Sequence, residues 1–290
     1  MNAIWILTKL TFREAMRRRI MLAGLVLGIA FIVIYSLGLH FILEQVALAA
    51  KAAIAENPSV PQSAQNIIGV ETMNGFLMAG LYAVTFLSIT MAALLGADTL
   101  AGEINSGTIQ TIVTKPIRRA DVVLGKWLGF AGLLGLYVLL MGGGVVLSMF
   151  LQTGYTPDNL LAGLLLIYME AVLIMSVTVT CSAAFPALAT GGIVFGLYGL
   201  SFIGGWIEQF GAVFHNQTAV QIGIFTSLII PSESLWRRAA FEMQTPLAGV
   251  LGISPFGAVS VPSVLMVAYA GLYLVVTLVL SIRIFQKRDL

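Results

Sequence analysis

Few side chains in this sequence could carry catalytic or metal-binding chemistry, and they are scattered along the chain. The two histidines, His40 and His215, are far apart, and Cys181 is the single cysteine. Metal sites need several His, Cys, Asp or Glu ligands at close spacing. The sequence therefore predicts no metal site, and it shows no cluster of acids, bases or nucleophiles that would indicate an enzyme.

One acidic residue, Glu170, stands near the middle of a long apolar stretch. A charged side chain at the centre of a bilayer costs about 2.5–3.5 kcal/mol or more. We therefore expect Glu170 to face the interior of a helix bundle or to be protonated. Two roles stay open: a polar position on a path across the membrane or at a contact between two copies, or a hydrogen-bonded structural carboxyl.

The segment from residue 98 to residue 127 joins two apolar stretches and is rich in polar residues. Gly107 and Pro116 bound a short predicted helix, and a basic turn follows it. Apolar residues give this helix a face that lies just outside the membrane: Ile109, Ile112 and Val113. An exposed apolar face of this kind indicates a partner protein.

Composition shows that the elements positioning these residues are membrane helices. The chain has 290 residues, of which 59% are hydrophobic and 10% charged, and its mean hydropathy is +0.97. A soluble domain carries about 25% charged residues. We expect an all-α integral membrane protein that forms a single membrane domain over residues 1–290.

A membrane-spanning helix needs about 20 apolar residues. Six stretches of the sequence meet this requirement: Ile20–Leu43, Phe76–Ala97, Leu128–Leu151, Leu160–Ser182, Pro186–Ile207 and Val264–Phe285. Small residues on two of them favour close helix contacts: Gly125, Gly129, Gly132 and Gly135 on the third, and Gly192 and Gly196 on the fifth.

The lysines and arginines predict the orientation of the chain. With the N-terminus in the cytoplasm, all of the 15 basic residues except Lys51, Arg237 and Arg238 fall on the inner side. Cytoplasmic loops of membrane proteins are enriched in Lys and Arg. We therefore expect both termini and residues 98–127 to be cytoplasmic, in the cell (inner) membrane.

Residues 1–19 predict a helix at the inner membrane surface. Lys9, Arg13 and Arg17 recur at four-residue spacing and share one face. Apolar residues lie largely on the other face: Ile4, Trp5 and Phe12. This pattern is typical of an interfacial helix, and the alternative is a basic flank that only fixes the topology.

Two outer regions differ in their predicted structure. The first, about Glu44 to Gly75, is expected to be a short loop with a turn at Asn57-Pro58 and Pro61. The second spans residues 208–263, and its apolar segment Ala219–Ile230 is too short to cross the membrane.

In this second region Pro231 ends the apolar segment, and Glu233 falls in the first turn of a further helix. That helix carries one apolar stripe: Leu235, Trp236, Ala239, Ala240 and Met243. We expect a re-entrant hairpin or a pair of interfacial helices before the last span.

The polar residues of segment 98–127 also follow a spacing found in a known family. A Glu stands four residues before a Gly-Thr pair, a Pro eight after the Thr, an Arg three after the Pro, and a Gly-Lys pair six beyond. The matching residues are Glu103, Gly107, Thr108, Pro116, Arg119, Gly125 and Lys126, with Arg118 in the same basic turn. Arg13-Glu14-Ala15 and the arginines after it also match the opening segment. The chain resembles the permease subunits of ABC transporters with a type 2 six-helix membrane domain.

The resemblance implies a division of labour between subunits. Residues 103–119 would contain a coupling helix that docks on a separate cytoplasmic ATPase, and two ATPases would assemble with two permeases, in a homo- or heterodimer. No G-x-x-x-x-G-K-[ST] motif occurs, so ATP is expected to bind the partner and this chain needs no cofactor of its own.

The function implied is transmembrane transport, and the family favours export. The alternative is a non-transporting membrane subunit that relays ATPase-driven motion to an accessory protein on the outer side. Neither hypothesis involves nucleic acid, and a membrane enzyme would need more clustered polar groups than Glu170 provides.

Overall fold

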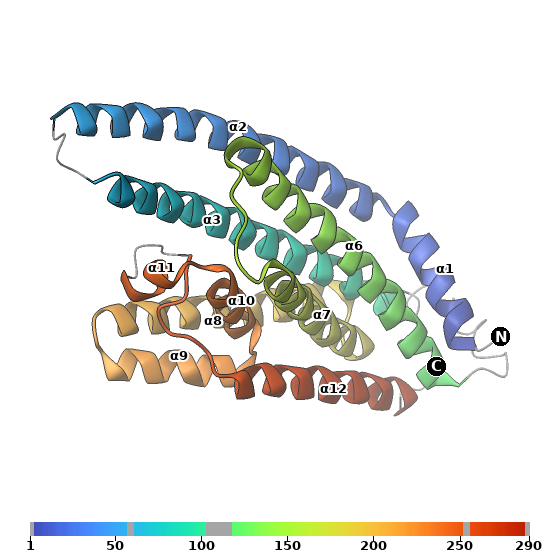
Figure 1. Cartoon of the computed structure of the whole chain (residues 1–290). Coiled ribbons are helices and arrows are strands. Elements are labelled where there is room, and N and C mark those ends of the chain that lie inside the picture. The colour runs from blue at the N-terminus through green and yellow to red at the C-terminus, as the bar shows by residue number, and fades with distance from the viewer. Residues whose placement is uncertain (1–2, 57–60, 103–117, 252–255, 288–290) are drawn as a thin grey trace.

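The computed structural model describes residues 3–56, 61–102, 118–251 and 256–287, and all of its regular elements in these ranges are helices (Figure 1). They are α1 (Ala3–Arg17), α2 (Arg19–Glu56), α3 (Gln62–Ala97), α6 (Arg119–Thr153), α7 (Leu160–Ala184), α8 (Ala187–Val213), α9 (Gln217–Ile229), α10 (Ser232–Met243), α11 (Pro246–Leu251) and α12 (Val264–Lys287). The predicted all-α class is confirmed.

Six of the described helices are long and apolar enough to cross a membrane: α2, α3, α6, α7, α8 and α12. The six apolar stretches of the sequence fall on these same helices. Helices α9 and α10 qualify only as a joined pair, and they are bent by 111° at the break between them. The prediction of six spans with a separate helix pair before the last one is therefore confirmed.

Helices α2 and α3 extend well beyond their apolar stretches, which corrects the predicted loop from Glu44 to Gly75. Helix α2 continues to Glu56 and α3 already begins at Gln62. Residues 44–56 are rich in alanine and other strong helix formers, so the helix continues where the hydropathy falls. The predicted turn at Asn57 and Pro58 lies outside the described residues.

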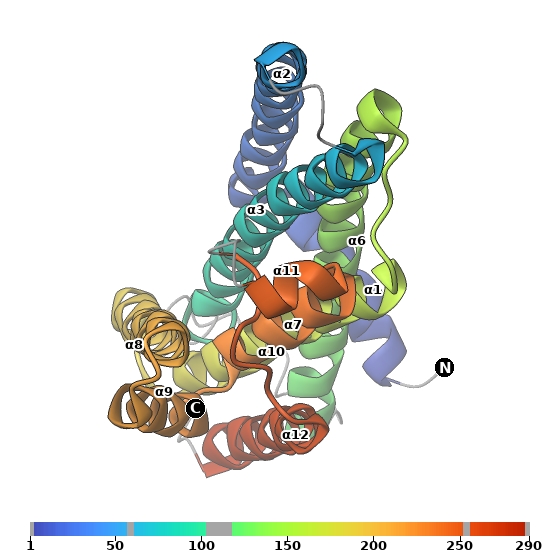
Figure 2. The same ribbon diagram turned by 60° about the vertical axis from the view of Figure 1, so that its left-hand side comes forward.

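Three helices form the centre of the bundle. Helices α3, α6 and α7 pack against one another, with α2 against α3 and α6, and with α8 and α12 against α7. Figure 2 shows α2 on one side of this centre and α8, α9 and α12 on the other. About half of the most apolar window of α3, α6 and α7 is buried, whereas only 11% of that of α2 is buried. Helix α2 thus leaves most of its apolar surface uncovered by the rest of the described chain.

Helix α1 packs along α6 with a different face from the one predicted. Its buried residues are Leu7, Thr11 and Ala15, whereas Trp5 is exposed. A Cβ atom at Gly125 would lie within 2.5 Å of Leu7 Cβ, and one at Gly129 would lie 2.9 Å from Thr11 Cβ. The glycines of α6 therefore let the backbone of α1 approach closely. This close contact decides which face of α1 is buried more strongly than the hydrophobicity of its side chains does.

The helix pair α9–α10 matches the predicted pattern closely. Helix α9 ends at Ile229, and α10 begins at Ser232 after Pro231, which occupies its N-cap position. The whole predicted apolar stripe of α10 is buried: Leu235, Trp236, Ala239, Ala240 and Met243. This face packs on α7, so α10 is part of the folded bundle.

Candidate functional site

The residues predicted to contact an ATPase divide between described and undescribed parts of the chain. Glu103, Gly107, Thr108 and Pro116 lie outside the described residues, and with them the predicted coupling helix. The structure places the flanks of this segment, namely residues 98–102 after α3 and the start of α6 from Arg118 onward.

Lys126 ties the start of α6 to the end of α3. This lysine is buried, and its Nζ donates a hydrogen bond to the backbone carbonyl oxygen of Thr99 at 3.1 Å. Carbonyl groups at a helix C-terminus lack partners within the helix, and a cation there is favourable. The two ends of segment 98–127 are thus held together at the base of the bundle.

Ser182 fixes the same segment to α7. Its hydroxyl oxygen accepts hydrogen bonds from the backbone N–H groups of Leu100 and Ala101, at 2.9 and 3.3 Å. Arg18 is the residue between α1 and α2, and its guanidinium lies 4.0 Å from the Asp98 carboxylate. The same guanidinium pairs with Glu14 at 2.7 Å. Residues 98–102 therefore contact the α1–α2 junction, α6 and α7 at once.

Arg119 connects the start of α6 to the end of α12. Its Nη1 donates hydrogen bonds to the carbonyl oxygens of Phe285 and Gln286, at 3.3 and 3.1 Å. The neighbouring Arg118 is exposed and caps α6 through its backbone alone. Arg119 and Lys126, predicted from one motif, thus bind the ends of two different helices.

Glu170 lies in the interior of the bundle, as predicted. Its side chain is fully buried on α7, and neither carboxyl oxygen has a hydrogen-bond partner among the described residues. Glu170 is close enough to Glu233 of α10 for the two carboxyl groups to interact electrostatically. A second buried acid thus lies within electrostatic range of Glu170, and the sequence pattern indicated it only as an acid in the first turn of a helix.

Glu233 belongs to a hydrogen-bonded network between α3, α8 and α10. Tyr82 donates from its hydroxyl to Glu233 Oε1 at 3.3 Å and accepts a bond from Trp206 Nε1 at 3.1 Å. The backbone N–H of Glu233 donates to Ser201 Oγ at 3.2 Å. A Cβ at Gly205 would overlap Glu233 Cγ, so this glycine lets the acid approach α8. Glu233 is therefore held in place by several helices.

Comparison with known proteins decides the family. A sequence model described as ABC-2 family transporter protein matches residues 5–290, nearly the whole chain. The chain belongs to the ABC-2 transporter family. Among curated proteins, none matches it as a relative.

This ABC-2 family protein is a multi-pass membrane protein with two different polar regions. One is formed by the flanks of segment 98–127, which are joined by hydrogen bonds between side chains and backbone groups. The other is formed by the acids Glu170 and Glu233, whose carboxyl groups are buried inside the bundle. In the described residues no group of three or more His, Cys, Asp or Glu could hold a metal ion. The sequence reasoning missed Thr99 and Ser182, which lack a motif and are signalled only by their position next to the ends of apolar stretches.

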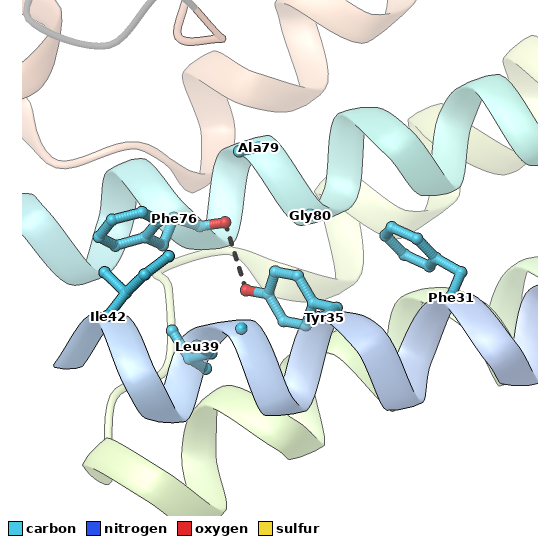
Figure 3. A pocket seen from close by; sticks show the side chains of 8 residues that line it. Phe31, Tyr35, Leu39, Ile42, Phe76, Ala79 and Gly80 are labelled. Carbon is cyan, nitrogen blue, oxygen red and sulfur yellow. Dashed lines mark hydrogen bonds between the residues drawn. The ribbon is translucent and has the colours of Figure 1, made fainter. Parts of the chain in front are cut away.

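An apolar groove of about 220 Å³ lies between α2 and α3 of the ABC-2 protein (Figure 3). Phe31, Leu39, Ile42 and Phe76 line it, and the hydroxyl of Tyr35 is occupied by a 3.2 Å hydrogen bond to the Phe76 carbonyl oxygen. No charged residue lines this groove. It therefore suits contact with lipid chains rather than with a polar ligand.

Proposed function

We propose that this ABC-2 family protein is the permease subunit that couples ATP hydrolysis, carried out by a separate cytoplasmic ATPase, to export of a substrate across the cell membrane. The chain itself performs no catalysis and needs no cofactor, because ATP binds the partner. The N- and C-termini and segment 98–127 face the cytoplasm, in line with the clustering of Lys and Arg there.

The observation that carries this proposal is the way both ends of segment 98–127 are anchored. Lys126 binds the end of α3 and Arg119 binds the end of α12, while Ser182 of α7 holds residues 100–101. Force applied between these anchors would be transmitted to four helices of the bundle. Residues 103–119, with Glu103, Gly107, Thr108 and Pro116, then form the contact with the ATPase.

Two ATPases and a second permease copy complete the proposed assembly, by analogy with the family pattern. Glu170 is the polar position on the transport path or at the contact between copies. The support for this role is that neither carboxyl oxygen has a hydrogen-bond partner among the described residues, whereas a structural carboxyl should be hydrogen-bonded.

The alternative function is transmission of ATPase-driven motion to an accessory protein on the outer side, without transport. Helices α9, α10 and α11 lie at the end of the molecule away from α1 (Figure 1) and would form the docking surface. ATP-driven movement of this end without any flux of solute would favour the alternative.

Charge reversal tests the coupling. We expect Glu103→Lys and Arg119→Glu to abolish stimulation of a co-expressed partner ATPase with a P-loop, and to reduce its co-purification. Arg283→Glu is the matched control, because Arg283 is an exposed arginine near the same end of α12. Wild-type stimulation in both loop variants would refute the assignment of this segment.

A further inference from the structure

A buried ion pair lies on the wall of a cavity formed by α8, α9, α10 and the segment before α12. Arg237 on α10 pairs with Glu208 on α8, and both side chains are at most 5% exposed. The cavity has a volume of about 220 Å³ and reaches the surface at the exposed Val261. Helices α9 and α10, which form part of its wall, lie at the end of the molecule away from α1 (Figure 1).

The ion pair leaves hydrogen-bonding capacity unused. Arg237 Nη2 donates to the hydroxyls of Ser227 and Ser234 at 3.3 and 3.4 Å, and Ser260 donates to Glu208 Oε1 at 2.6 Å. Arg237 Nε and Glu208 Oε2 have no hydrogen-bond partner among the described residues. Buried polar groups of folded proteins nearly always have a partner, so these two atoms are available to a group bound in the cavity.

The irregular wall of the cavity is held in one conformation. Gln209 accepts hydrogen bonds from the backbone N–H groups of Val259 and Ser260, both at 3.1 Å, and donates to the Gly257 carbonyl oxygen at 2.7 Å. Gln244 makes a reciprocal pair with the backbone of Ala258, at 2.9 and 3.2 Å. A wall fixed in this way reduces the ordering cost of binding a ligand.

Charge balance defines the class of ligand. Glu208 and Arg237 are the two charged residues on the wall, one of each sign. A net anion would lie against Glu208 and a net cation against Arg237, whereas a group carrying both charges satisfies both. The volume lies below the roughly 300–1,000 Å³ of a site for a drug-sized ligand, so a headgroup-sized molecule fits.

We infer that this cavity binds a small zwitterionic group with an ammonium and a phosphate, the phosphate on Arg237 and the ammonium on Glu208. The group belongs either to a phosphatidylethanolamine headgroup or to a free solute such as O-phosphoethanolamine. Exposed apolar residues beside the cavity favour a lipid, because its acyl chains could lie along them: Ile224, Val264 and Leu265.

Calorimetric titration of the purified chain with O-phosphoethanolamine tests the ligand class, with inorganic phosphate, ethanolamine and glycerol as comparison solutes. We expect saturable binding of O-phosphoethanolamine, and at least about tenfold weaker binding of each comparison solute, since phosphate and ethanolamine each lack one charge-assisted contact and glycerol lacks both. The absence of O-phosphoethanolamine binding together with the absence of retained phosphatidylethanolamine would overturn the inference. Equal binding of phosphate or glycerol would overturn it too.

Variants locate the site. The double variant Glu208→Gln/Arg237→Gln removes both charges at nearly constant volume, and Ser260→Ala is a milder change for use where the double variant does not fold. Both should weaken binding, while Glu242→Gln, which alters an ion pair of the same helix outside the cavity, should not. Unchanged binding in both site variants would place the ligand elsewhere and refute the inference.

Lipid analysis separates the two sources. The chain is reconstituted with equal amounts of phosphatidylethanolamine and phosphatidylglycerol, and the retained lipid is identified by mass spectrometry. Enrichment of phosphatidylethanolamine that Ser260→Ala or the double variant abolishes supports the headgroup, and binding of O-phosphoethanolamine without enrichment supports the free solute. Preferential retention of phosphatidylglycerol in the wild type would contradict the charge argument.

Discussion

The Nζ atom of Lys126 lies 3.1 Å from the carbonyl oxygen of Thr99 and joins α6, which begins within segment 98–127, to the residues directly after α3. Replacing Lys126 by methionine keeps the aliphatic chain and removes the donor, which leaves a buried carbonyl without this bond. We expect the free energy of unfolding to fall by about 1–3 kcal/mol, measured by denaturant titration. Lys9→Met, on an exposed position of α1, is the control, and an equal loss in that variant would contradict the argument.

Gly125 gives a second prediction, which concerns the packing of α1. A Cβ at this position would meet Leu7 Cβ and the backbone oxygen of Ile4, so Gly125→Ala forces α1 and α6 apart. We expect a loss of about 1–3 kcal/mol in unfolding free energy and faster proteolysis within α1. Gly143→Ala on the same helix meets no atom within 4 Å and should instead stabilise by about 0.5–1 kcal/mol. Equal effects of the two substitutions would refute this contact.

Glu170→Gln tests the buried acid on α7. Because neither carboxyl oxygen is hydrogen-bonded among the described residues, the neutral isostere loses no bond, and the unfolding free energy should change by less than about 1 kcal/mol. Substrate flux in reconstituted vesicles should nevertheless fall at least about tenfold if the residue lines the path. Normal flux in Glu170→Gln would leave Glu170 with a structural role only.

Glu233 predicts a pH dependence of stability. The pKa of this carboxyl is raised from 4.5 to about 7, chiefly by burial and to a lesser extent by Glu208, against the lowering effect of Arg237 and of the Tyr82 hydroxyl. Glu170 of α7 faces it as well. The folded chain therefore holds a proton that the unfolded chain releases near pH 4.5. Between about pH 4.5 and 7 the folded state binds more protons, so stability should decrease as the pH rises, by about 3 kcal/mol at most.

The measurement is the unfolding free energy from pH 5 to pH 8 in wild type and in Glu233→Gln. The variant should show a shallower slope than the wild type, because glutamine does not titrate. Glu242→Gln on the same helix, which breaks the ion pair with Arg238, should keep the slope. A wild-type stability that increases with pH across this window would show that the sign is wrong.

The spans were predictable from the sequence because each depends on a single local property, the length of an apolar stretch. The outer end of α2 was not, since residues 44–56 are helical through the intrinsic propensity of their alanines rather than through an apolar stretch. The start of α3 at Gln62 carries no comparable signal in the sequence. The packed face of α1 was not predictable either, because it is set by Gly125 and Gly129 on a helix more than 100 residues away.

Of the candidate site, the sequence predicted the basic residues of segment 98–127 but not the groups that they bind. The motif spacing identified Arg119 and Lys126 but not their acceptors, since backbone carbonyl groups leave no trace in the sequence. The sequence places Arg237, Glu208 and Glu233 in the outer region of residues 208–263 and gives no sign that they are buried. The structure buries all three, because charges of opposite sign on neighbouring helices can enter the interior together when they pair.

Side-specific labelling of a cysteine at position 110 tests the central claim most directly, namely that segment 98–127 meets an ATPase in the cytoplasm. The variant is Gln110→Cys in a Cys181→Ala background, labelled by a membrane-impermeant maleimide in right-side-out and inverted membrane vesicles. We predict labelling in inverted vesicles, reduced when the ATPase is co-expressed. Labelling confined to right-side-out vesicles would contradict both the orientation and the coupling role.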